Sequence, residues 1–120
     1  MSQRDDMVSL RHMLDQAREA VEMARGRTRT DLDTDRMFNL SMTRLLEIVG
    51  EAASRVSAEG REQISTIPWP KVVGLRNRLI HGYDEVDFDI LWNTVRDDLP
   101  LLISVIENFL ARTEPDTPSQ

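Results

Sequence analysis

Apolar residues recur three and four positions apart in three long stretches of the chain. The first stretch covers residues 5–25, the second residues 34–56 and the third residues 88–109. Because an α-helix turns by about 100° per residue, this spacing puts the apolar side chains of each stretch on one face. We therefore expect three long amphipathic helices that bury these faces against one another.

Shorter segments with capping and turn signals connect these stretches. Residues 26–33 are polar, and Asp33 is the expected N-cap of the second long helix. Residues 58–66 predict a short helix or turn. A further helix is expected over residues 70–81, with a proline in its first turn and with Gly82 after its last residue.

Two residues shape the last long helix. Asp87 stands just before it and can accept hydrogen bonds from its first free N–H groups. Pro100 falls inside it without changing the phase of the apolar positions, so we expect the helix to kink there and to continue. No strand pattern is found. The sequence therefore predicts an all-α, up-and-down bundle of four to five helices, formed by residues 1–112 and followed by a flexible tail at residues 113–120.

Composition narrows the functional classes. A net charge of −6 argues against the broadly basic surface of a general nucleic-acid binder. Cysteine is absent, no apolar run reaches the ~20 residues of a membrane helix, and the N-terminus does not resemble a signal peptide. We expect a cytoplasmic protein in which any contact with RNA is local. Trp69 can pack in the core or stack on a base, and the candidate cations near it are Lys71, Arg76, Arg78, Arg55 and Arg61.

Most of the chemically capable side chains follow from Arg76 onward. On an ideal helix Arg76 falls inside the apolar arc, where a guanidinium needs a carboxylate, a phosphate or a partner subunit. Glu47 and Glu51 are candidates to neutralise or orient Arg76 or His81. The alternative is that both glutamates belong to an exposed helix face stabilised by ion pairs. No histidine or further carboxylate is spaced to complete a metal site with them, so no metal is expected.

From Arg76 to Tyr83 the chain reads as an arginine, a polar residue, three further residues and then His-Gly-Tyr. This motif resembles the signature of the HEPN ribonuclease superfamily, in particular its HepT-like toxin branch. Three flanking segments also look like that branch and occur in the same order: residues 46–53, 67–69 and 95–100. The resemblance, over about residues 5–110, implies a helical homodimer with RNA-cleaving sites at the subunit interface. It also implies a type II toxin–antitoxin pair in which an MntA-like nucleotidyltransferase antitoxin attaches AMP to Tyr83.

Metal-free cleavage of RNA through its 2′-hydroxyl requires a base, an acid and a cation beside the charged phosphorane. His81 can serve as base or acid near neutral pH, and Arg76 can donate to two phosphate oxygens. On one helix these side chains would point about 140° apart, and each chain supplies one motif histidine. A two-fold dimer would let them cooperate more easily. Asn77, Arg78 and Lys71 are expected to support the site or position RNA.

The main hypothesis is therefore a metal-independent endoribonuclease toxin without a cofactor. AMP on Tyr83 would add bulk and negative charge beside His81 and so hinder the RNA phosphate. The alternative is a non-catalytic dimeric subunit that binds a nucleotide or acts as an adaptor for a nucleotidyltransferase. A structural bundle with a vestigial motif is a third possibility. The sequence contains no recognisable code for the RNA target.

Overall fold

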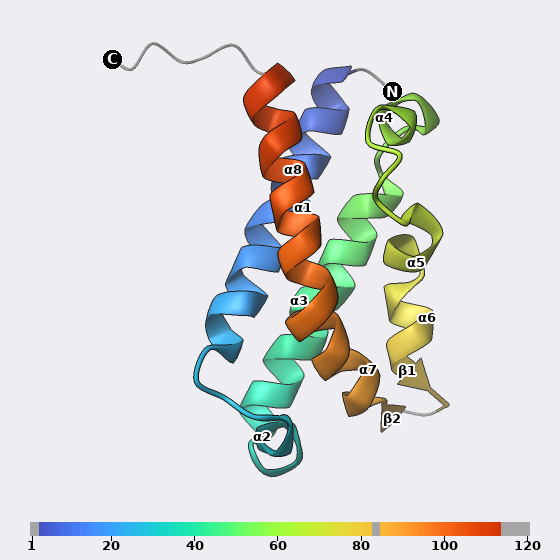
Figure 1. Cartoon of the computed structure of the whole chain (residues 1–120). Helices are drawn as coiled ribbons and strands as arrows, with labels where there is room; N and C mark the ends of the chain where they lie inside the picture. The colour runs from blue at the N-terminus through green and yellow to red at the C-terminus, as the bar shows by residue number, and fades with distance from the viewer. Residues whose placement is uncertain (1–2, 83–84, 114–120) are drawn as a thin grey trace.

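Three long helices dominate the computed structural model, which describes residues 3–82 and 85–113 (Figure 1). They are α1 (Gln3–Ala24), α3 (Arg36–Ser54) and α8 (Leu99–Thr113). Figure 1 shows α1 leading away from the N-terminal end, α3 returning, a set of short helices leading away again and α8 returning. This alternation confirms the predicted all-α, up-and-down bundle.

Short elements join the long helices. A short helix within residues 58–66 is confirmed, and the segment after it forms two brief helices in place of one. These elements are α2 (Arg29–Thr34), α4 (Ala58–Gln63), α5 (Trp69–Val73), α6 (Leu75–Leu79), α7 (Phe88–Asn93) and the strands β1 (Ile80–His81) and β2 (Glu85–Val86).

The core lies where the apolar stripes of α1, α3 and α8 meet. Burial of these side chains supplies the main free energy of folding, since each removes apolar surface from water. α5, α6 and α7 add their own apolar faces to the same core. The largest fully buried side chains are Leu10, Met13, Leu32, Met42, Leu46, Val49, Leu79, Leu91, Leu99 and Ile106.

Gly50 lets α5 approach α3 closely. A Cβ atom at this position would lie 3.1 Å from the backbone oxygen of Val72, which is closer than side-chain carbons normally come. The absence of a side chain at Gly50 therefore makes room for the backbone of α5. This contact fixes the position of the segment that carries Arg76.

The start of α3 differs from the prediction. Its N-cap is Asp35, whose side chain accepts a hydrogen bond from the N–H of Phe38, and Asp33 lies inside α2. Arg27 bridges Asp31 and Asp35 at 3.3 and 2.8 Å. The hydrogen bond from Arg27, followed by that from Phe38, lowers the pKa of Asp35. These bonds stabilise α2. The sequence analysis did not predict this helix, because residues 26–33 are polar.

The helix expected over residues 70–81 is wrong in two places. It breaks at Gly74, and α6 ends at Leu79, so His81 belongs to a two-residue strand. Ile80 pairs with Val86 in an antiparallel hairpin, and the N–H of Asp87 donates to the Leu79 oxygen at 2.7 Å. Tertiary pairing of β-branched residues thus overrides the local helical pattern.

Gly82 has a different role from the one predicted. Its φ of 62° is left-handed, but it lies in the turn after β1 and does not follow the last residue of a helix. Glycine adopts this conformation without the steric cost of a side chain.

A π-helical turn, Thr94–Asp98, joins α7 to α8. The N–H of Leu99 donates to the oxygen of Thr94, five residues earlier. Pro100 follows directly; it has no N–H, and its ring crowds the carbonyl four residues before it. The expected irregularity at Pro100 therefore takes the form of a wider turn, and the helix continues beyond it. The kink itself stays a prediction.

The ends of the described chain add two observations. α8 includes Thr113, and the rest of the predicted tail lies outside the described residues. Among the helices that the structure describes, none has the length and apolar character to cross a membrane.

Candidate functional site

An open groove lies between the outer face of α3 and the β-hairpin. It has a volume of about 720 Å³ and is mostly polar. α3 provides one wall, while α6, the hairpin and the start of α7 provide the other. Its lining residues are Arg36, Asn39, Leu40, Thr43, Arg44, Glu47, Arg76, Ile80, Gly82, Val86 and Phe88.

Arg76 stands at the edge of this open groove. Its side chain is 69% exposed, so the prediction that it lies within the apolar arc is wrong. The break at Gly74 leaves α6 with a narrow buried stripe, formed by Leu75 and Leu79. Arg76 falls beside that stripe, with its guanidinium available to solvent.

Glu47 provides the counter-charge that the sequence analysis expected. Its Oε2 atom lies 3.3 Å from Nε of Arg76, and its side chain is only 17% exposed. The Oε1 atom lies 3.8 Å from Arg44. Glu51, the other candidate, pairs with Arg44 at 3.2 Å. The structure therefore joins Arg76 to Glu47 and leaves Glu51 outside the pair.

His81 lies in a neighbouring hollow. Its side chain is 56% exposed, and Nε2 lies 3.7 Å from Oδ2 of Asp87. Val86 and Phe88 line both this hollow and the open groove, so the two spaces adjoin. The angle of about 140° expected from one helix does not apply, because α6 ends before His81.

Asp87 is a site residue whose second contact the sequence analysis missed. Its Oδ1 accepts hydrogen bonds from the N–H groups of Asp89 and Ile90, which confirms the predicted cap of the last helical segment. The same carboxylate presents Oδ2 to His81. The capping signal identified the residue, but only the hairpin shows that it reaches the imidazole.

Two predicted residues remain apart from these contacts. Asn77 is exposed on α6 and shares no helix with His81, because α6 ends between them. Tyr83 lies outside the described residues. No group of three His, Asp or Glu side chains within residues 3–82 and 85–113 is arranged to hold a metal ion.

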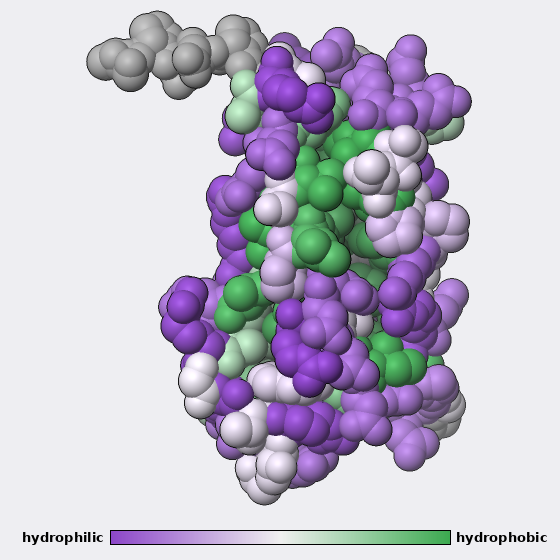
Figure 2. Space-filling model, in the orientation of Figure 1, coloured by the Kyte–Doolittle hydropathy of each residue, from purple (hydrophilic) through white to green (hydrophobic). Residues whose placement is uncertain are grey.

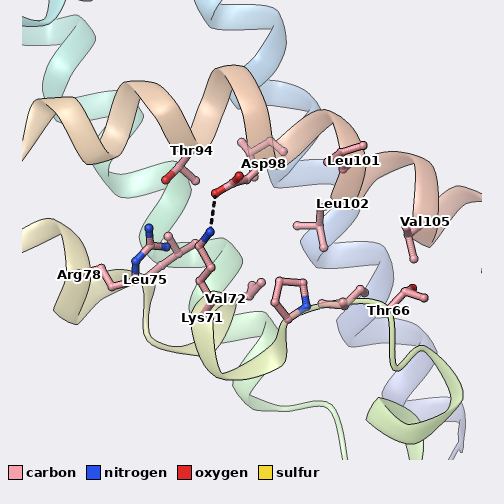
Figure 3. A pocket seen from close by; sticks show the side chains of 13 residues that line it. Thr66, Lys71, Val72, Leu75, Arg78, Thr94, Asp98, Leu101, Leu102 and Val105 are labelled. Carbon is pink, nitrogen blue, oxygen red and sulfur yellow. Dashed lines mark ion pairs between the residues drawn. The ribbon is translucent and has the colours of Figure 1, made fainter.

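Lys71 and Arg78 lie on a different face from Arg76. Both line a second groove, between α5 and α8 (Figure 3). Lys71 pairs there with Asp98 at 3.5 Å. The cations that the sequence analysis grouped near Trp69 are therefore divided between two surfaces.

Trp69 is a packing anchor. It is buried, and its indole N–H donates to the oxygens of Arg61 and Ile64 at 3.2 and 3.1 Å. The guanidinium of Arg61 lies over the ring at 5.7 Å. The base-stacking interpretation is wrong in this structure, because the ring is not open to a nucleic acid.

Comparison with known proteins shows the family of this chain. Residues 13–109 match the Ribonuclease HepT-like family. Over 107 residues the chain is 34% identical to "Putative RNase MJ1380" of Methanocaldococcus jannaschii, covering 89% of this chain and 98% of that protein. It is 34% identical over 93 residues to "Probable ribonuclease HepT" of Thermococcus cleftensis, covering 74% and 84%. No solved structure matches the chain. The chain therefore belongs to the HepT-like ribonuclease family.

Proposed function

We propose that the chain is a metal-independent endoribonuclease that cleaves RNA through the attack of a 2′-hydroxyl on the adjacent phosphate. One observation carries this proposal. The exposed guanidinium of Arg76, braced by Glu47, stands at an open groove that adjoins the hollow of His81. This arrangement occurs in a member of a ribonuclease family.

Arg76 would stabilise the charged phosphorane. Its recorded pair with Glu47 uses Nε, so both Nη groups remain to donate to phosphate oxygens. Glu47 is largely covered and would restrict the guanidinium to the edge of the groove. A braced donor has less freedom to lose when it binds a phosphate, and so favours the transition state.

His81 would transfer the proton, as base or as acid. Asp87 faces its Nε2 atom, which favours a proton on that nitrogen and leaves Nδ1 to accept one. Because the two capping hydrogen bonds hold the carboxylate in place, Asp87 would position the imidazole. Asn77, exposed on α6, would contact ribose or phosphate nearby.

The second histidine would come from a second copy of the chain. Two apolar side chains stand exposed at this end of α3, Met37 at 80% and Leu40 at 52%. Leu40 also lines the open groove. A two-fold dimer that covers these side chains would bring two copies of the open groove together and supply base and acid from different subunits.

Control of this activity would act on Tyr83. In the sequence this residue comes directly after Gly82, and Gly82 lines the open groove. We include in the proposal a role as a toxin whose nucleotidyltransferase antitoxin transfers AMP to the tyrosine hydroxyl. The added phosphate would repel the RNA phosphate, and the adenosine would occupy space in the groove. Tyr83→Phe should escape this inhibition when the antitoxin and ATP are present. If the antitoxin and ATP still abolish the toxicity of Tyr83→Phe, inhibition through AMP on Tyr83 is contradicted.

The test is cleavage of mixed cellular RNA by purified protein in excess EDTA, with intact mass measured to detect added AMP. Wild type is compared with Arg76→Ala and His81→Ala. Arg25→Ala and His12→Ala are matched controls: His12 is exposed on α1, and Arg25, exposed just after the end of α1, also pairs with a glutamate. We expect cyclic 2′,3′-phosphate ends from wild type and both controls, and cleavage slower by at least about 10²-fold in the two site variants.

If either site variant cleaves RNA at a rate close to that of wild type, the catalytic assignment of the substituted residue is wrong. If unmodified wild type is inactive, and Arg76→Ala and His81→Ala impair only the binding of a nucleotidyltransferase, the adaptor function replaces the nuclease. If the purified protein carries AMP and is inactive, removal of the AMP should restore cleavage.

A further inference from the structure

A second groove, between α5 and α8, is apolar where the open groove is polar. Its floor consists of Ile67, Val72, Leu75, Leu99, Leu102 and Val105. Figure 2 shows it as a hydrophobic area on the face that carries α8 and the short helices. Figure 3 shows side chains from both walls directed toward the space between them. The floor residues also belong to the core, so this space opens directly onto it.

The volume of this apolar groove indicates what it can hold. It measures about 160 Å³. An apolar cavity of about 150 Å³ holds one benzene molecule, whereas sites for whole metabolites occupy about 300–1,000 Å³. The apolar groove therefore fits a single large side chain better than a complete small molecule. Pockets of this kind receive the anchor residues of protein partners.

Leu101 extends the apolar surface beyond the groove. It stands at the rim and is 70% exposed, and it is the exposed large hydrophobic side chain of α8. A ligand the size of one side chain would leave Leu101 in water. A protein segment lying across the groove would cover it and insert an anchor beside it.

The charges at the rim indicate the chemistry of the partner. Lys71 faces Asp98 at 3.5 Å, whereas the half-buried side chain of Arg78 has no carboxylate partner among residues 3–82 and 85–113. Burying an unpaired guanidinium beneath a partner is costly unless that partner supplies an acid. An RNA strand would meet an aliphatic floor on which bases cannot stack.

Two polar residues of the groove, Thr94 and Asp98, come from the π-helical turn. Such turns occur frequently at functional sites, where the wider backbone redirects side chains. Asp98, on this turn, pairs with Lys71, so within the described part of the chain Arg78 stays without a carboxylate partner at this rim.

We propose that the groove between α5 and α8 docks a helical segment of a partner protein, which inserts one large apolar side chain and pairs an adjacent acidic side chain with Arg78. This inference does not depend on ribonuclease activity. It assigns a second surface to the chain, separate from the groove that carries Arg76.

The test uses synthetic helical peptides of roughly 15 residues. The first peptide carries Phe and Leu four residues apart with Glu between them; the second has Lys in place of Glu, and the third has Ser in place of Phe. Binding to the full chain is followed by the methyl NMR signals of Leu101, Leu102 and Val105. We expect the Glu peptide to bind about fivefold to tenfold more tightly than the Lys peptide. The Ser peptide should bind more weakly than either.

Arg78→Glu should reverse the preference between the Glu and Lys peptides, and Leu101→Ser should weaken binding of both. Val8→Ser is the matched control, because Val8 is similarly exposed, at 63%, on another helix. If neither Phe peptide moves the methyl signals, or if Arg78→Glu leaves the preference unchanged, the proposal is wrong. Concentration-dependent self-association that Leu101→Ser abolishes would make a second copy of this chain the occupant, which also overturns it.

Discussion

The open groove and the apolar groove both include residues of α6, yet they differ in volume, polarity and charge. The open groove is about 720 Å³, polar, and holds the pair of Arg76 and Glu47. The apolar groove is about 160 Å³ and exposes Leu101 at its rim. Arg76 and Arg78 are two residues apart on a helix and so face opposite sides. A cluster of cations in a sequence is therefore not always a cluster in space.

The sharpest test of this comparison is to remove each arginine in turn. Arg76→Ala should lower RNA cleavage by about 10²–10³-fold, because it removes the donor to the phosphorane. Arg78→Ala should change cleavage by no more than about threefold, since this half-buried side chain lies on another face, where solvent screens its charge from the open groove. The rates are measured on one RNA substrate under the same salt. Equal losses in the two variants would mean that RNA contacts both faces.

A substitution at Gly50 should disturb both grooves together. Gly50→Leu places a side chain where a Cβ would already lie 3.1 Å from the Val72 oxygen, and so forces α5 away from α3. We expect the free energy of unfolding in urea to fall by about 2 kcal/mol. Ser54→Leu, at an exposed position of α3, should change it by less than about 0.5 kcal/mol. If Gly50→Leu is as stable as wild type, α5 does not need this close approach.

Substitution of Glu47 distinguishes two ways in which this residue can act on the open groove. It can hold the Arg76 guanidinium in position, or it can act only through its negative charge. Glu47→Gln removes the counter-charge of Arg76, and we expect cleavage to fall by about fivefold to tenfold as the guanidinium loses its position. Glu51→Gln is the matched control, because Glu51 lies one turn away and pairs with Arg44. An equal effect of the two substitutions would show that the glutamates act only through net charge.

The smallest expected effect concerns stability in acid, away from both grooves. The pKa of Asp35 is lowered by Arg27, so its contribution to stability is present above the ordinary carboxyl pKa of about 3.9 and is lost as the pH falls through the lower folded value. Asp35→Asn keeps a capping oxygen but removes the titration. Its free energy of unfolding should therefore decline less than that of wild type between about pH 5 and pH 2. If the free energies of unfolding of Asp35→Asn and wild type decline in parallel as the pH falls, Asp35 is not a source of acid sensitivity.

The sequence was sufficient for the long helices, because their apolar periodicity extends over many turns and is little affected by neighbours. It also identified Asp87 as a cap, and it named Glu47 and Glu51 as candidate counter-charges for Arg76, of which the structure selects Glu47. It failed where a few residues decide between helix and strand. The pairing of Ile80 with Val86 depends on contacts between segments, and no local pattern indicated it. The exposure of Arg76 was missed for another reason, because the sequence did not indicate the break at Gly74.

The π-helical turn before Pro100 has a consequence for the angular position of the residues around it. Leu91, Val95 and Leu99 are all buried, at successive intervals of four. In a regular α-helix two such steps would rotate the buried direction by about 80° around the axis. A wider turn rotates less per residue and compensates for that drift, so α8 enters the bundle with its core stripe still facing α1. Deleting one residue between Thr94 and Asp98 would remove this compensation and turn Leu101 toward a different neighbour.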